Sequence, residues 1–123
     1  MTTISVVGVV DDDAGIRHAL GVLLRSAGFR VATFASAEDF LASGQLVTTA
    51  CLILDLQMPG MDGLDLQQRL IDDGHRVPIV VLTAHGDDAV RNRALAAGAL
   101  RLLKKPVDGE ALLEAVSFAL RTA

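Results

Sequence analysis

Polar residues suited to phosphate and metal chemistry stand at the ends of apolar runs in this chain. Asp55 lies in the segment 51–56 (Cys-Leu-Ile-Leu-Asp-Leu), where five of the six residues are apolar. Such a run is typical of a strand covered on both faces, and a carboxylate held against it is unfavourable unless a cation or a shifted pKa compensates. The polar residues that follow other apolar runs are Asp11, Asp12, Asp13, Thr83 and Lys105. Acids, a hydroxyl and an ammonium group are the parts needed to hold a phosphoryl group and a divalent metal.

Each of these residue types has a definite chemical use. Clustered carboxylates repel one another unless a cation balances them, and hard oxygen ligands of this kind suit Mg²⁺. Because Mg²⁺ normally takes only one or two carboxylates, Asp55 is available as a nucleophile that forms an acyl phosphate. Lys105 can place a point charge on a phosphate oxygen, and Thr83 can donate a hydrogen bond to another. The residues therefore predict Mg²⁺-dependent phosphoryl chemistry at Asp55.

Apolar runs alternate with segments of helical period along the whole chain. The runs predict strands at residues 4–10, 30–34, 50–55, 78–83 and 100–103. Helical spacing predicts helices at 16–27, 63–73 and 87–97, a short helix that begins after Ser36 and a last helix capped by Asp108. Gly28, Gly74 and Gly98 each follow a predicted helix, where a left-handed helix end favours glycine. Five such units predict an α/β fold with a doubly wound parallel sheet and helices on both faces.

This architecture predicts where the polar residues meet. In an open parallel sheet, ligands bind beyond the carboxyl ends of the strands, near the point where the strand order reverses. The acids, Thr83 and Lys105 all follow strand ends, so we expect them at one edge of the sheet although they are far apart in the sequence. The strand at 30–34 contributes no such residue, which suits a strand at the border of the sheet.

Length and composition limit the class of protein. At 123 residues, 51% of them hydrophobic, the chain is expected to form one domain, residues 1–123. The single Cys51 cannot form an internal disulfide, and the chain has neither a signal-peptide pattern nor an apolar run of the roughly 18 residues that a membrane span needs. We therefore expect a cytoplasmic protein without a membrane partner. The net charge of −4 and the four Phe without Trp or Tyr argue against direct binding of nucleic acid.

Four segments in this order and spacing resemble the receiver domain of two-component response regulators, over essentially the whole chain. They are residues 10–13 (Val-Asp-Asp-Asp), 54–63 (Leu-Asp-Leu-Gln-Met-Pro-Gly-Met-Asp-Gly), 81–87 (Val-Leu-Thr-Ala-His-Gly-Asp) and 104–106 (Lys-Lys-Pro). The third and fourth segments are most similar to the nitrogen-fixation branch, whose members usually carry a LuxR-type DNA-binding output domain. The resemblance implies a flavodoxin-like receiver fold with five helices and strand order 2-1-3-4-5.

The resemblance also assigns roles to individual residues. It implies that a partner histidine kinase phosphorylates Asp55 and that Thr83 and Lys105 bind the phosphoryl group. It implies a Mg²⁺ ion held by Asp12 and Asp55 directly, and by Asp11 through water. The backbone carbonyl of Gln57 completes the protein ligands, and the Lys105-Pro106 peptide bond is expected to be cis. Such a protein is a phosphoacceptor switch that assists its own phosphorylation and dephosphorylation, and is not a turnover enzyme.

The expected output surface consists of the fourth helix, the fifth strand and the fifth helix. Phosphorylation would change this surface and control either dimerisation or a transcriptional output domain absent from this chain. We expect Val90, Ala94 and Leu102 to form the apolar centre of the surface. Many receivers carry Tyr or Phe where this chain has Leu102, which predicts a weakly biased switch. Gln57 and His85 are expected to set the phosphoryl lifetime.

Two alternatives remain open on the sequence alone. A phosphohydrolase of the haloacid dehalogenase type would use Asp11 as its nucleophile, with Thr83 and Lys105 as later motif residues. That alternative gives Asp55 no role and needs a cap for which the chain lacks length. A receiver-like interaction module that never accepts phosphate is the other alternative, and the complete set of polar residues argues against it. Gly8, inside the first strand, is typical of a close backbone approach.

Overall fold

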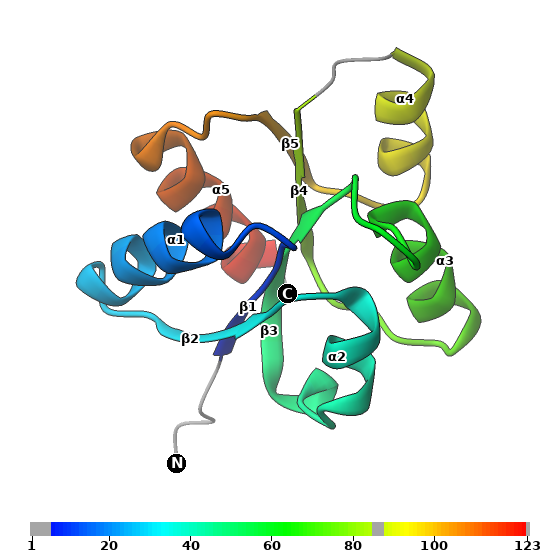
Figure 1. Cartoon of the computed structure of the whole chain (residues 1–123), viewed down its shortest axis with the longest axis horizontal. Coiled ribbons are helices and arrows are strands. Elements are labelled where there is room, and N and C mark those ends of the chain that lie inside the picture. The colour runs from blue at the N-terminus through cyan, green and yellow to red at the C-terminus, as the bar shows by residue number, and fades with distance from the viewer. Residues whose placement is uncertain (1–5, 85–87, 123) are drawn as a thin grey trace.

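The computed structural model describes residues 6–84 and 88–122, in which strands alternate with helices (Figure 1). The strands are β1 (Val6–Val10), β2 (Arg30–Phe34), β3 (Thr49–Asp55), β4 (Ile79–Thr83) and β5 (Arg101–Lys104). The helices are α1 (Ala14–Ser26), α2 (Ala37–Ala42), α3 (Gly63–Asp72), α4 (Asp88–Ala96) and α5 (Gly109–Thr122), with a short 3₁₀ helix at Leu46–Thr48. Every predicted strand and helix is present. The predicted start of the first strand and the predicted residue 87 of the fourth helix lie outside the described residues.

All five strands are parallel, and their order is β2-β1-β3-β4-β5, which confirms the expected topology. The order reverses between β1 and β3, because the chain goes from β1 outward to β2 and then returns to the other side of β1. Val10, the last residue of β1, pairs with Leu54, the residue before Asp55. Thr83, the last residue of β4, pairs with Lys104. The register therefore brings four strand ends to the same edge of the sheet.

Helices cover both faces of the sheet, α1 and α5 on one face and α2, α3 and α4 on the other (Figure 1). Each face has its own apolar core. Val9, Leu24 and Val116 belong to the core beneath α1 and α5, whereas Leu52 and Phe40 belong to the core beneath α2, α3 and α4. Successive residues of β3 and β4 enter opposite cores, so both strands are buried along most of their length. This double burial explains why they appear in the sequence as unbroken apolar runs.

Local interactions define where the helices begin and end. Asp13 caps α1, because its side chain accepts a hydrogen bond from the Ile16 backbone N–H at 3.0 Å. Ser36 caps α2 in the same way, and Asp108 accepts from the Ala111 N–H before α5. The predicted glycines after α1, α3 and α4 do adopt positive φ, at 94°, 77° and 100° for Gly28, Gly74 and Gly98.

Two expectations about packing need correction. A Cβ on Gly8 would lie 3.1 Å from Cδ1 of Leu52, so the glycine makes room for a core side chain rather than for another backbone segment. Ala94 is fully buried, and Val90 and Leu102 pack against the core, so these residues do not form an exposed apolar centre. The large exposed apolar side chain on α4 is Leu95.

None of the helices within residues 6–84 and 88–122 combines the length and the apolar character needed to cross a membrane.

Candidate functional site

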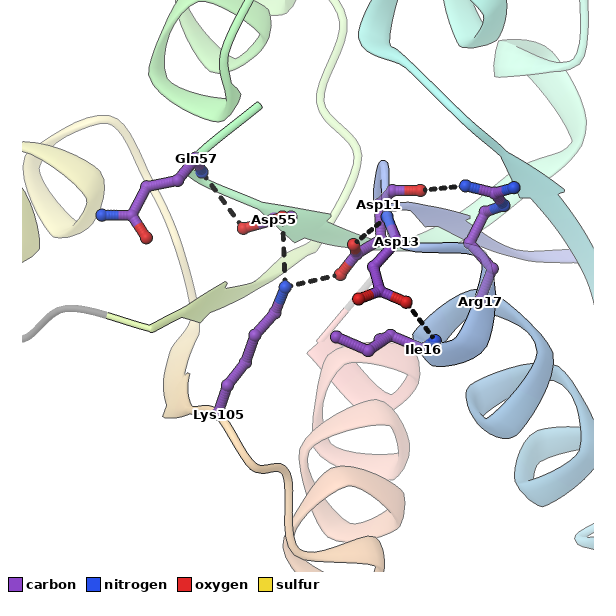
Figure 2. Close-up of polar contacts among 7 residues, drawn as sticks. All are labelled: Asp11, Asp13, Ile16, Arg17, Asp55, Gln57 and Lys105. Carbon is purple, nitrogen blue, oxygen red and sulfur yellow. Dashed lines mark hydrogen bonds and ion pairs between the residues drawn. The ribbon is translucent and has the colours of Figure 1, made fainter. Parts of the chain in front are cut away.

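Asp11 lies directly after β1 and is fully buried. One carboxylate oxygen, Oδ1, accepts a hydrogen bond from the Asp13 backbone N–H at 2.9 Å. The other, Oδ2, lies 2.9 Å from Nζ of Lys105 in an ion pair that lacks the alignment of a hydrogen bond. The backbone carbonyl of Asp11 accepts a hydrogen bond from Nη1 of Arg17 at 2.8 Å (Figure 2). The Asp13 N–H and the Lys105 ammonium therefore hold the carboxylate of Asp11, and Arg17 holds its backbone carbonyl.

Asp55 ends β3 and is 2% exposed. Its Oδ1 accepts a hydrogen bond from the Gln57 backbone N–H at 3.1 Å, and its Oδ2 accepts one from Nζ of Lys105 at 3.1 Å. Figure 2 shows the Lys105 ammonium between the carboxylates of Asp55 and Asp11. The chain passes close behind Asp55, because a Cβ on Gly63 would lie 2.6 Å from the Asp55 carbonyl oxygen. Only glycine allows α3 to begin so near the end of β3.

Burial and neighbouring charges shift the pKa values of both Asp55 and Lys105. Burial raises the pKa of the Asp55 carboxyl above its ordinary value, and the neighbouring charge of Asp11 raises it further, against the lowering effects of the Gln57 N–H and Lys105. For Lys105, partial burial lowers the pKa, but the close contacts with the negatively charged carboxylates of Asp11 and Asp55 together outweigh it. The pKa of Lys105 is therefore raised, and the lysine is a firmly charged ammonium between two acids.

Thr83 and Lys105 reach the site from neighbouring strands. Thr83 is the last residue of β4 and is fully buried. Its carbonyl accepts a hydrogen bond from the Lys105 backbone N–H at 2.9 Å, so the two residues are joined through the backbone. The Lys105-Pro106 peptide bond is cis, as expected. His85, expected to affect the phosphoryl lifetime, lies outside the described residues.

The acidic residues are arranged as a possible metal site. Asp11, Asp12 and Asp55 each offer a carboxylate oxygen, and these atoms lie within 4.8 Å of one another. Asp12 is exposed, whereas the other two are buried, so the group opens to solvent on one side. Carboxylate oxygens at a partly open position fit Mg²⁺, which prefers hard ligands and retains several waters. Gln57 is adjacent, with its side chain exposed and its backbone N–H on Asp55. Asp13 does not belong to this group, because it caps α1.

The structure brings together six of the residues that the sequence singled out, and leaves Asp13 apart as the cap of α1. They are Asp11, Asp12, Asp55, Gln57, Thr83 and Lys105. Sequence reasoning missed Arg17, whose guanidinium holds the Asp11 carbonyl. One signal pointed to it. Arg17 lies near the N-terminus of α1, where the helix dipole disfavours a cation, so a compensating contact could have been expected.

A sheet of this order with carboxylates, a hydroxyl and an ammonium at its carboxyl edge defines a class of phosphate-handling α/β domains. Residues 7–117 match the response regulator receiver domain family, and the chain belongs to that family.

Relatives and solved structures agree with this assignment. The chain is 43% identical over 119 residues to response regulator protein TmoT of Ectopseudomonas mendocina, covering 97% of this chain and 54% of that protein. It is 37% identical to the transcriptional regulatory protein FixJ of Bradyrhizobium diazoefficiens, covering 100% of this chain and 60% of the relative. It superposes on the structure of response regulator StyR with a TM-score of 0.89 and 46% identity, covering 96% of this chain and 60% of that one. The chain thus spans little more than half the length of these relatives.

Family membership decides against the phosphohydrolase that the sequence left open. A receiver domain is a phosphoacceptor switch rather than an enzyme that turns over a substrate, and this class includes the chain. The phosphohydrolase alternative with Asp11 as nucleophile is therefore set aside.

Proposed function

We propose that the chain accepts a phosphoryl group on Asp55 from a histidine kinase and uses it to switch an output surface. The single observation that carries this proposal is the position of the Asp55 carboxylate. It is buried, it is hydrogen-bonded to Lys105, and it lies within 4.8 Å of the carboxylates of Asp11 and Asp12. A carboxylate so placed can react with a phosphoryl group while neighbouring acids hold a cation.

In the proposed transfer, one bond to phosphorus forms and one breaks. An oxygen of Asp55 attacks the phosphorus of the phosphohistidine, forming the O–P bond of an acyl phosphate, while the P–N bond breaks and its electron pair remains on the histidine nitrogen. The residues that would hold Mg²⁺ are Asp12, Asp55, the Gln57 carbonyl and, through water, Asp11. When bound, Mg²⁺ supplies positive charge that offsets the repulsion between carboxylate and phosphoryl oxygens.

Lys105 and Thr83 have complementary tasks in this proposal. The ammonium of Lys105 already lies 3.1 Å from Oδ2 of Asp55, so it can bind an oxygen of a phosphoryl group attached to that carboxylate. Thr83 ends the neighbouring strand, and its hydroxyl can donate a hydrogen bond to another phosphoryl oxygen. Because the Thr83 carbonyl is bonded to the Lys105 N–H, movement of one residue affects the other.

The output surface in this proposal is made of α4, β5 and α5. Thr83 is followed within a few residues by α4, which begins at Asp88 and is largely exposed. The guanidinium of Arg101 at the start of β5 lies 3.8 Å from the centre of the Phe118 ring and so joins β5 to α5. A change at Thr83 can therefore reach this surface, whose partner we infer to be a second receiver or a DNA-binding output domain of a longer, cytoplasmic regulator.

Chemical phosphorylation with acetyl phosphate and Mg²⁺, followed by mass spectrometry, tests the acceptor. We expect one phosphoryl group on the peptide that contains Asp55, and none in Asp55→Asn. Asp13→Asn is the matched control, because asparagine also caps helices and Asp13 lies outside the carboxylate group. Label on Asp11, or undiminished labelling of Asp55→Asn, would overturn the proposal.

A further inference from the structure

The amide of Gln67 on α3 is an unusual buried group outside the carboxylate site. The residue is only 1% exposed, and its Nε2 donates a hydrogen bond to the Ala94 carbonyl on α4 at 3.1 Å. Its Oε1 is buried and has no hydrogen-bond partner among the residues that the structure describes. Burying an amide oxygen without a partner is unfavourable, and leucine would fill the same space without that penalty. Gln67 therefore makes one directional contact between α3 and α4 at the expense of an unsatisfied acceptor.

Helix α4 buries little apolar surface within the described residues, although its Val90 also packs partly buried against the core. Ala94 is its fully buried residue, and an alanine contributes little apolar area compared with the leucines of α3. The Ala94 carbonyl also accepts a hydrogen bond from the Ala99 N–H at 3.1 Å, which closes the C-terminal end of the helix. The Gln67 bond thus joins α3 to α4 where α4 meets the core. The opposite end of α4 follows closely after Thr83.

We propose that Gln67 is a positioning residue of the switch, which favours the arrangement of α4 seen in this structure. The step from α4 position to signalling rests on the proposed function, whereas the effect on α4 itself does not. A hydrogen bond has a narrow range of distance and angle, so it favours one helix position over others, whereas apolar packing tolerates small shifts. A ligand or modification that moves α4 must break this bond and find a new partner for the amide.

A purely structural role would have a different consequence. If Gln67 only stabilised the fold, replacing it with leucine would lower the free energy of unfolding and loosen the whole domain. In the proposal, Gln67→Leu removes an unsatisfied acceptor and leaves the Ala94 carbonyl bonded to Ala99, so global stability is kept or raised. Only α4 becomes more mobile. The proposal thus predicts lower local stability in α4 without a loss of global stability.

Hydrogen exchange followed by mass spectrometry separates these possibilities in Gln67→Leu. We expect the amides of α4 to exchange about tenfold faster than in the unmodified chain, as for the loss of one net hydrogen bond, with exchange in α1 and α5 unchanged. The urea midpoint should be equal or higher. The matched control is Gln68→Leu, the same substitution one residue further on. Within the described part of the chain, the exposed side chain of Gln68 bonds only to Asp72 on its own helix, at 2.9 Å.

A second arm uses beryllium fluoride with Mg²⁺ as a phosphoryl mimic. In the unmodified chain we expect the mimic to change the exchange rate in α4. In Gln67→Leu we expect a smaller change, because the hydrogen bond from residue 67 to the Ala94 carbonyl is already absent. Exchange in α4 equal to that of Gln68→Leu would overturn the proposal, and so would a lowered urea midpoint with faster exchange throughout. If the mimic leaves exchange in the unmodified chain untouched, the proposed function fails, while the arm without mimic still tests the Gln67 bond.

Discussion

Asp55 carries its negative charge in a place where the fold penalises that charge. Its pKa is raised by burial and by Asp11, so the folded state binds a proton at this carboxyl more readily than the unfolded chain does. A raised folded pKa means that the contribution of this group to stability is fully present below its unfolded pKa and is lost as the pH rises through the folded pKa. At neutral pH the ionised Asp55 is therefore a source of instability, which the ammonium of Lys105 offsets only in part.

Asp55→Asn should consequently be more stable than the unmodified chain near neutral pH, by about 1 kcal/mol. Lys105 keeps Asp11 as its partner, so no cation is left unpaired. The gain should shrink as the pH falls from about 7 to about 4, because Asp55 then becomes neutral in the unmodified chain. Urea unfolding followed by circular dichroism at several pH values measures this difference. A gain that does not depend on pH would assign the effect to something other than the charge.

Arg17 influences a cation at the carboxylate site in two opposing ways. Its own charge repels Mg²⁺, whereas its hydrogen bond to the Asp11 carbonyl holds the loop that carries Asp11 and Asp12. We expect the second effect to dominate, since the exposed Asp12 depends on this loop for its direction. Arg17→Leu should weaken Mg²⁺ binding about fivefold in isothermal titration calorimetry. Arg25→Leu, which removes the same charge from the exposed far end of α1, is the control. Tighter Mg²⁺ binding in Arg17→Leu would show that only the charge matters.

At the scale of elements, the start of α3 depends on a single missing side chain. A Cβ at Gly63 would meet the Asp55 carbonyl at 2.6 Å and the Leu56 Cα at 2.7 Å, and both are backbone atoms that cannot rotate away. Gly63→Ala should therefore lower the free energy of unfolding by about 2 kcal/mol.

The same substitution should displace the end of β3 and so weaken Mg²⁺ binding. Gly109→Ala at the start of α5 is a matched control, because its Cβ would lie 3.4 Å from a methyl group of Leu23, an ordinary contact. Its stability should stay within about 0.5 kcal/mol of the unmodified chain. Urea denaturation measures the free energy of unfolding of both variants, and isothermal titration calorimetry measures their Mg²⁺ affinity. Equal losses in the two variants would mean that the close approach at Gly63 is relieved elsewhere.

The elements differ in how well the sequence predicted them. Strands β3 and β4 were found within a residue of their ends, because burial on both faces produces an unbroken apolar run. The orientation of α4 was wrong, since the sequence placed Ala94 on the outside and the structure buries it. The helix contains few apolar residues, so Val90, Ala94 and Leu95 do not define a unique buried face.

The residues that act through their own chemistry were predicted, whereas two residues that hold backbone carbonyls in place, Arg17 beside the site and Gln67 outside it, were not. Carboxylates, threonine and lysine after strand ends indicate a phosphate and metal site by their types alone. Arg17 and Gln67 act on backbone carbonyls, at Asp11 and Ala94, and a carbonyl gives no signal in the sequence. The neighbour of Gly8 was unpredictable for a related reason, because the Leu52 side chain reaches it only through the pairing of β1 with β3.

At the scale of the whole molecule, the two faces of the sheet offer different surfaces to a partner. Leu95 on α4 is 49% exposed, and Val22 on α1, across the sheet, is 52% exposed. If the α4 side mediates self-association of the phosphorylated form, Leu95→Lys should weaken it by about tenfold or more, whereas Val22→Lys should not. Lysine in the last turn of a helix also suits the helix dipole, so α4 itself should be kept.

Sedimentation velocity at several concentrations, with and without beryllium fluoride and Mg²⁺, measures this association. The unmodified chain should associate more tightly with the mimic. If Leu95→Lys and Val22→Lys weaken self-association equally, the contact does not depend specifically on the α4 side. A chain that is monomeric under both conditions would leave only a contact with an output domain in a longer protein.

The position of Lys105 also affects how the domain folds in the absence of metal. Its ammonium lies against both Asp11 and Asp55, so the chain carries its own counter-ion for the charges that it buries. A newly synthesised domain can therefore complete its sheet before it encounters any metal. Excess chelator should leave the domain folded, and addition of Mg²⁺ should raise its melting temperature. Unfolding on chelation would contradict this. Under the proposed function, Mg²⁺ is then needed for phosphorylation and not for folding, so a cell short of Mg²⁺ would keep a folded domain that cannot be phosphorylated.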